Sequence, residues 1–260
     1  MGNPGLVTLG IGAIGLSALY ALVGVALVRR FMHGHVREGH NDVLVPLFLT
    51  AGTLYAVLLG FLVIAVWESY EGAKSNAAEE ASTLATLYRQ TNGMPSSERR
   101  EMRGLLREYD EAVAGGEWQI QAATGGASPQ ARKAIGDIYR AFGAMPREDA
   151  SSSISVEFLQ TLRTVASDRN RRTLQASERL PGVLWFGLLL GGALVVGMSF
   201  LLYMDVRWPH VLGSGLMAAL IGTFLLITLL LNAPFSGPLA LSSESFDHSL
   251  SVFDSVDRGN

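Results

Sequence analysis

Residues 6–28, "LVTLGIGAIGLSALYALVGVALV", contain the pattern GxGxxG from Gly10 to Gly15 within 23 residues that carry no charge. The pattern marks a dinucleotide site only when a strand precedes it, a helix follows it and an acidic residue stands about 20 residues further on. None of these conditions is met here. A hydrocarbon core about 30 Å thick needs roughly 20 apolar helical residues to cross it. The stretch therefore predicts a membrane-spanning helix with glycines on its surface.

Three further charge-free blocks of similar length occur in the chain of 260 residues, at 43–67, 180–204 and 211–231. Only helices or closed barrels cross a bilayer, because no water is present there to satisfy backbone N–H and C=O groups. The sequence predicts an all-α membrane protein with four transmembrane helices and a helical soluble insert between the second and third. The expected segments are a first transmembrane hairpin (1–67), a water-facing insert (68–179), a second transmembrane hairpin (180–231) and a C-terminal segment (232–260).

Composition narrows the class of protein further. The formal net charge of -3 and the lack of basic runs alternating with aromatic residues disfavour nucleic-acid binding. The chain has no cysteine, which excludes disulfides and thiol chemistry but does not identify the compartment. The first block lacks a basic n-region and exceeds the roughly 7–15 residues of a signal peptide's apolar region, so we expect it to remain as a span. No cofactor motif is present.

Helical spacing organises the insert into about four helices. The second span is predicted to continue to about Arg89 as one long helix. Ser96 or Ser97 is expected to cap the next helix, which closes at Gly115 and Gly116, and "GGEWQIQAATGG" at 115–126 is predicted to be a loop. Ser128 followed by Pro129 predicts a third helix start, with proline at the first helical position. A last helix is predicted at 153–179.

The C-terminal segment combines a turn, "NAPFSGP" at 232–238, with a short amphipathic helix. Phe246, Leu250 and Phe253 share one face of that helix. Its polar residues are acidic, whereas helices that lie on a membrane favour Lys and Arg on the polar face. Packing under the insert is therefore favoured over binding the membrane surface.

Arginines beside the spans indicate an orientation. The first hairpin holds Arg29, Arg30 and Arg37, and the second holds Arg207. This places both hairpins in the cytoplasm of a bacterium, and the insert and both termini outside the inner membrane. Basic residues near spans on the insert side oppose this orientation, but long loops translocate largely regardless of charge.

The four blocks contain no Asp, Glu, Lys, Arg or His. Proton relays and ion-coupled carriers place ionisable groups inside the membrane, so a pump or secondary transporter is disfavoured. Instead, small residues recur four apart, which allows helix backbones to approach closely. Each such stripe is either a packing seam or the lining of a narrow pore. The stripes are Ala13, Ser17 and Ala21; Gly52, Ala56 and Gly60; Gly187 and Gly191; and Ser214, Ala218 and Gly222.

Three polar groups outside the blocks have candidate roles. The run "RNRR", with Arg169, Arg171 and Arg172, could bind lipid phosphates, the alternative being a salt-bridged surface. The loop "HGHVREGHND" at 33–42 holds three histidines and two acids, but a solvated hairpin is favoured over a metal site because the spacing is not that of a finger or helix. Glu79 and Glu80 could attract ions or simply be solvated. No acid, base and nucleophile set can be assembled, so the chain is predicted not to be an enzyme.

Several stretches resemble the bestrophin-like family of mainly bacterial membrane proteins. They are "HND" at 40–42, "LYAVLLGFLVIAVWESY" at 54–70, "EEASTLATLYR" at 79–89, "YDEAVAGGEW" at 109–118, "ERLPGVLWFGLLLGG" at 178–192 and "APFSGPLALSSESF" at 233–246. The resemblance implies kinship with bestrophins, pentameric anion channels with four spans, a helical region between the second and third, and a pore lined by the second helix. It also implies a cytoplasmic insert, opposite to the arginine count. By the same resemblance the pore would be lined by one arc of the second span, formed by Gly52, Ala56, Leu59, Gly60 and Val63.

Two functions follow as hypotheses. The leading one is a homo-oligomeric, channel-like protein in the lipid bilayer that passes small ions, with the insert as vestibule or gate. The alternative is a non-conducting sensor or scaffold whose insert binds an envelope partner or ligand. A solvent-filled groove lined by Trp118 would favour the alternative.

Overall fold

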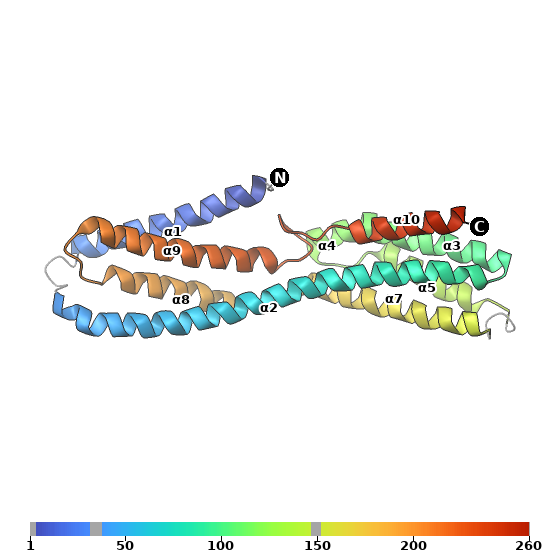
Figure 1. The fold of residues 1–260 in the computed structure, drawn as a ribbon, viewed down its shortest axis with the longest axis horizontal. Coiled ribbons are helices and arrows are strands. Elements are labelled where there is room, and N and C mark those ends of the chain that lie inside the picture. Colours follow the sequence, from blue (N-terminus) through green and yellow to red (C-terminus); the bar gives the residue numbers. More distant parts are fainter. Residues whose placement is uncertain (1–3, 32–37, 147–151, 260) are drawn as a thin grey trace. The chain divides into compact units, whose positions relative to one another are not determined.

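The computed structural model describes residues 4–31, 38–146 and 152–259. The chain divides into two compact units. The membrane unit comprises Met1–Glu68 and Arg179–Asn232, and the insert unit comprises Ser69–Glu178 and Ala233–Asn260. Helix α2 (Asn41–Gln90) runs through 50 residues and contributes to both (Figure 1).

The membrane unit contains four helices that are long and apolar enough to cross a bilayer. They are α1 (Pro4–Phe31), the first part of α2, α8 (Gly182–Phe200) and α9 (Arg207–Leu231). The prediction of four transmembrane helices is confirmed, and the chain is a membrane protein. The third span is shorter than its apolar block, because Pro181 occupies the N-cap of α8 and the helix ends at Phe200.

Two of the small-residue stripes form a packing seam between α1 and α9. Ala21 on α1 and Ala218 on α9 are both buried in one cluster. A Cβ atom added at Gly222 would overlap Ser17 Oγ, so a side chain at this position would force Ser17 to shift. These helices therefore approach closely through the residues that the spacing singled out, as expected where lipid provides no hydrophobic drive for association.

A buried histidine belongs to this unit although it lies outside the four apolar blocks. His210, in the first turn of α9, is 4% exposed, and its Nε2 lies 2.8 Å from the carbonyl oxygen of Ser199. Ser199 Oγ in turn lies 3.0 Å from Ser214 Oγ. Polar groups that are removed from water need such partners. The contacts join the end of α8 to the start of α9.

The insert unit is a helical bundle around one core. It combines the second part of α2 with η2 (Thr91–Gly93), α3 (Ser96–Glu111), a π-helical turn η3 (Ala112–Glu117), α4 (Trp118–Thr124), α5 (Pro129–Gly143), α7 (Ser153–Ser177) and α10 (Glu244–Arg258). The long helix ends at Gln90, close to the predicted Arg89. Ser128 caps α5 as predicted, because its Oγ accepts from the backbone N–H groups of Gln130 and Ala131.

Two local predictions for the insert are wrong. The N-cap of α3 is Pro95, and no side chain caps this helix, so Ser96 and Ser97 do not have the predicted role. Residues 115–124 are helical rather than a loop, because burial of Trp118 and Gln121 stabilises α4 despite the two glycines. The chain turns only at Gly125, whose φ of 69° favours glycine and whose added Cβ would lie 2.8 Å from the carbonyl oxygen of Ala176.

Helix α10 closes the insert core. Phe246 and Phe253 are fully buried, and Leu250 is partly buried against the same cluster. Phe253 stacks on Tyr88 of α2 with ring centroids 4.0 Å apart. The amphipathic C-terminal helix therefore packs within the insert, as its acidic polar face predicted.

Candidate pore face and buried charge cluster

The predicted pore face of α2 is divided by the structure into two parts. Ala56 and Gly60 are exposed, and a Cβ atom added at Gly52 or Gly60 would meet nothing within 4 Å. The small-residue stripe is thus open in the single chain. Its surroundings are apolar, and residues 43–67 contain no Asp, Glu, Lys, Arg or His. Such a surface can contact lipid, another helix or a narrow aqueous passage.

Leu59 and Val63 lie on the other part and pack against α8 in the single chain. Leu59 is 6% exposed and clusters with Tyr55, Leu188 and Val195, and Val63 packs against the same cluster. Tyr55 can approach α8 because Gly191 and Gly192 have no side chains, and Tyr55 Oη donates to the carbonyl oxygen of Leu188 at 3.2 Å. Both residues therefore hold α2 against α8 within one chain. All five predicted pore residues lie on one side of α2. Their spacing in the sequence could not show that α8 covers part of that side.

A buried charge cluster joins five helical segments of the insert. Arg172 of α7 is fully buried and donates from Nε to Glu80 Oε2 at 2.7 Å and from Nη2 to Glu80 Oε1 at 3.1 Å. The same guanidinium donates from Nη1 to Gln121 Oε1 at 3.0 Å and from Nη2 to Glu117 Oε2 at 3.2 Å. Tyr109 Oη donates to Glu80 Oε1 at 2.6 Å. The cluster ties α2, α3, η3, α4 and α7 together.

Glu117 has two further partners and is placed by the π-helical turn. Its Oε1 accepts from Arg169 Nη2 at 2.7 Å and from the backbone N–H of Ser128 at 3.1 Å. A π-turn rotates the residues after it relative to a regular α-helix, and such turns are frequent at functional sites. Here the turn from Ala112 brings the carboxylate into the core. Two glutamates and two arginines then balance one another in charge.

Burial and neighbouring charges shift two pKa values in the cluster. Burial alone would lower the pKa of Arg172, but Glu80, Tyr109 and Glu117 raise it above its ordinary value. Burial, followed by the charge of Glu80, raises the pKa of Tyr109 well above its usual range. Arg172 is therefore permanently charged and Tyr109 remains a hydrogen-bond donor. The arrangement pairs ions and contains no group set to transfer a proton.

The lipid-phosphate prediction for the "RNRR" run is wrong for two of its three residues. Arg172 is inaccessible, and the side chain of Arg169 is 11% exposed and paired with Glu117. Arg171 is different, because its side chain is 61% exposed and its Nη1 lies 3.9 Å from Asp168 Oδ1. A basic run cannot reveal which member faces a core. The missed partner Glu80 did have a signal, since it falls at helical spacing between the buried Ala77 and Leu84.

Other candidate groups remain apart. Glu79 is exposed, unlike its neighbour Glu80. His33 and His35 lie outside the described residues. Within the part of the chain that the structure describes, no group of three or more His, Cys, Asp or Glu residues is placed to hold a metal ion.

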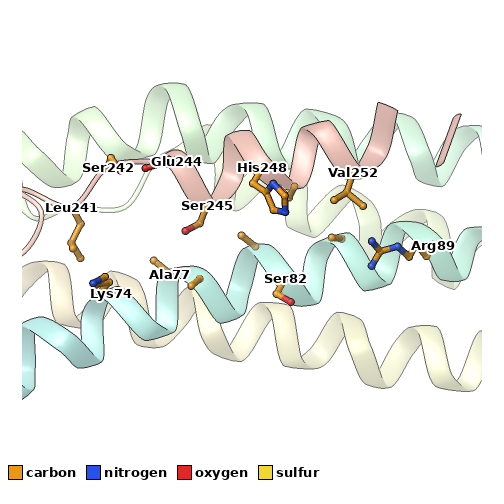
Figure 2. Close-up of a pocket in the computed structure, with 14 residues that line it drawn as sticks. Lys74, Ala77, Ser82, Arg89, Leu241, Ser242, Glu244, Ser245, His248 and Val252 are labelled. Carbon is orange, nitrogen blue, oxygen red and sulfur yellow. The ribbon is translucent and has the colours of Figure 1, made fainter. Parts of the chain in front are cut away.

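A groove of about 500 Å³ separates α2 from α10 in the insert unit (Figure 2). Its floor includes Ala77, Ala78, Ala81 and Ala85 of α2. Figure 2 shows His248 and Ser245 on the side of α10 that faces α2, with Lys74 and Arg89 towards the two ends. Trp118 is not part of this groove, because its Nε1 donates to the carbonyl oxygen of Leu241 at 2.8 Å within the core.

Comparison with solved structures supports the fold. A bacterial bestrophin homologue from Klebsiella pneumoniae matches with a TM-score of 0.72 and 14% identity over 95% of this chain and 96% of that chain. A variant of that homologue with one mutation matches with a TM-score of 0.75 and 14% identity over 95% and 98% of the two chains. No curated protein matches the sequence. The model of the bestrophin-like domain matches residues 15–246, so this chain belongs to the bestrophin-like family.

Proposed function

We propose that the chain forms a homo-oligomeric channel in the bacterial inner membrane that passes small ions, with anions as the class to test first. The observation that carries the proposal is the open stripe of Gly52, Ala56 and Gly60 on a helix whose other side packs against α8. Small residues allow close approach between helices. Copies of α2 arranged around an axis would cover this stripe and leave a narrow, uncharged passage between them.

The absence of Asp, Glu, Lys, Arg and His from the four apolar blocks supports passive conduction rather than coupled transport. Selectivity in such a pore depends on its diameter and on the dipoles and apolar constrictions that line it. Helix α2 continues from the membrane unit into the insert unit without interruption. We propose that the insert forms the vestibule or gate of the same passage.

We expect purified protein in planar bilayers to produce single-channel currents, with a reversal potential in a KCl gradient on the anion-selective side. Gly60→Trp would place an indole in the passage and should lower or abolish the unitary conductance. Phe61→Trp is the matched control, because Phe61 is 69% exposed at the next helical position and points about 100° away. Equal unitary conductance in both variants would contradict the prediction that Gly60 lines the pore. A monomer in mass photometry together with no current would refute the channel.

The groove between α2 and α10 favours a second candidate function. A pocket of about 500 Å³ is large enough for a small ligand, so the insert could serve a non-conducting sensor or scaffold. The bilayer recording separates the two functions. A stable oligomer that never conducts, combined with a ligand that protects the groove from hydrogen exchange, would support the sensor instead.

We propose from the arginine count that the insert is extracytoplasmic, although the family resemblance implies the reverse. The absence of cysteine makes this directly measurable. Single cysteines at Ser97 in the insert and at Asp205 in the second hairpin would both be exposed. A membrane-impermeant maleimide added to intact cells should label Ser97→Cys and not Asp205→Cys. The opposite labelling pattern would place the insert in the cytoplasm.

A further inference from the structure

Four arginines of α3 line one cleft of the insert unit. The cleft has a volume of about 450 Å³, within the range of small-ligand pockets, and lies beside the last turns of α2 and α10. The arginines are Arg99, Arg100, Arg103 and Arg107. Gly104 lies between them, and a Cβ atom added there would meet nothing within 4 Å. The missing side chain leaves the wall of the cleft open.

Two of these guanidinium groups are already neutralised by α10. Arg103 Nη1 donates to Asp257 Oδ1 at 2.8 Å, and Arg107 Nη2 donates to Asp254 Oδ1 at 2.9 Å. Arg103 Nε also donates to Thr91 Oγ1 at 3.1 Å. These contacts fix both side chains in place. Asp254 and Asp257 are therefore not available as partners for Arg99 and Arg100.

The other two guanidinium groups have no carboxylate partner among the described residues. Arg99 donates from Nη2 to the main-chain carbonyl oxygen of Met94 at 3.1 Å, and the side chain of Arg100 is exposed and makes no hydrogen bond or ion pair with any described residue. The glutamates of α3 do not line the cleft. Four guanidinium groups against two carboxylates leave an excess of two positive charges. Charge of one sign in a cleft with low-dielectric walls raises the local concentration of counter-ions.

We propose that this arginine cleft binds a phosphate-bearing anion, with Arg99 and Arg100 as its direct ligands. Guanidinium groups bind phosphate oxygens through paired, charge-assisted hydrogen bonds, and two adjacent guanidiniums without carboxylate partners match a dianion. The open position at Gly104 provides room for it. The phosphate belongs either to a soluble compound or to a lipid headgroup. The proposal for this cleft does not depend on ion conduction along α2.

The first test uses the full chain in neutral detergent at low salt, titrated with sodium pyrophosphate in a calorimeter. The double variant Arg99→Gln with Arg100→Gln should bind about tenfold more weakly or worse, because each charged ligand lost removes a charge-assisted hydrogen bond. The control, Arg132→Gln with Arg140→Gln, removes two exposed arginines of α5 and should bind as the wild type does. Added NaCl should weaken wild-type binding.

Gly104→Leu provides a second, charge-neutral variant. It fills the open wall and exchanges glycine for a better helix former, so the protein should keep its melting temperature while losing pyrophosphate binding. For the lipid source, native mass spectrometry of the chain in nanodiscs with phosphatidic acid should show retained lipid that the double variant loses. Binding by either arm that depends on Arg99 and Arg100 supports the site. Binding in neither arm, or equal binding by both double variants, would overturn it.

Discussion

Replacing Arg172 with methionine is expected to reduce the free energy of unfolding of the insert unit by about 3–5 kcal/mol, the cost of leaving buried carboxylates without their cation. Arg172 is the only described residue that donates to both Glu80 and Glu117. It also lies 5.5 Å from the ring centroids of Trp118 and Phe246. Methionine can replace the packing of the side chain but none of its hydrogen bonds.

The matched control for this change is Arg171→Met. Arg171 precedes Arg172 on the same helix, but its side chain is 61% exposed, so its loss should change stability by no more than about 0.5 kcal/mol. Unfolding can be followed by tryptophan fluorescence in a background where Trp67, Trp185 and Trp208 are replaced by phenylalanine. Trp118 then reports on the environment of Arg172 alone. Similar free energies of unfolding for the two variants would show that the buried charge cluster does not stabilise the insert unit.

A second comparison separates the loss of ion pairing from the loss of polar groups. Removing the charges of Arg172 and Glu80 together, as Arg172→Met with Glu80→Leu, should restore part of the stability lost in Arg172→Met, because Glu117 keeps its ion pair with Arg169. Replacing both partners of a buried ion pair by apolar groups is often neutral or stabilising, whereas removing one partner leaves the other unpaired. A double variant less stable than the single one would contradict this account.

Sequence patterns predicted the parts of the fold that depend on local physics. The length of each apolar block predicted the spans, because lipid requires apolar side chains along the whole block and a backbone whose polar groups are satisfied within the helix. Ser128 caps α5 through its own neighbours, and the spacing of Phe246 and Phe253 already showed which face of α10 is buried. None of these features needs knowledge of a distant segment.

The features that were missed depend on partners far away in sequence. Gly115 and Gly116 indicated a helix end, but Glu117 is held by Arg169, 52 residues later, and this contact favours a π-turn over a break. Arg172 is part of a basic run, and only the position of Glu80 on α2 distinguishes it from the exposed Arg171. Leu59 and Gly60 are neighbours in sequence, and the glycines of α8 decide which of them is covered. Tertiary contacts therefore determined these three corrections.

The second large effect concerns Asp110, the buried carboxylate of α3 that has no arginine. It is 0% exposed and accepts a hydrogen bond from Ser249 of α10, while its Oδ1 has no partner among the described residues. Burial raises the pKa of Asp110 from 3.8 to about 7, the Ser249 hydrogen bond opposes this, and the charges of Asp247, Glu80 and Glu111 add to it. The folded state thus favours the protonated form.

Because the pKa is higher in the folded than in the unfolded state, the stabilising contribution of protonated Asp110 is present in full below pH 3.8 and is lost as the pH rises to about 7. At about 1.4 kcal/mol per pKa unit, the loss amounts to about 4 kcal/mol. We expect Asp110→Asn, which has the shape of the neutral acid, to be more stable than the wild type by a few kcal/mol at pH 8 on the same scale and similar to it at pH 4.

The difference between wild type and Asp110→Asn should be measured by denaturant unfolding at pH steps from 4 to 8, since contributions that the two proteins share cancel in the difference. Asp137→Asn is the control of opposite sign: a hydrogen bond from Lys133 lowers the pKa of Asp137, so its substitution gives no gain at high pH. Hydrogen exchange at Ser249 locates the effect, because the ionised carboxylate weakens the docking of α10 on α3. Parallel pH profiles for wild type and Asp110→Asn would mean that Asp110 ionises without penalty, and α10 would then dock independently of pH.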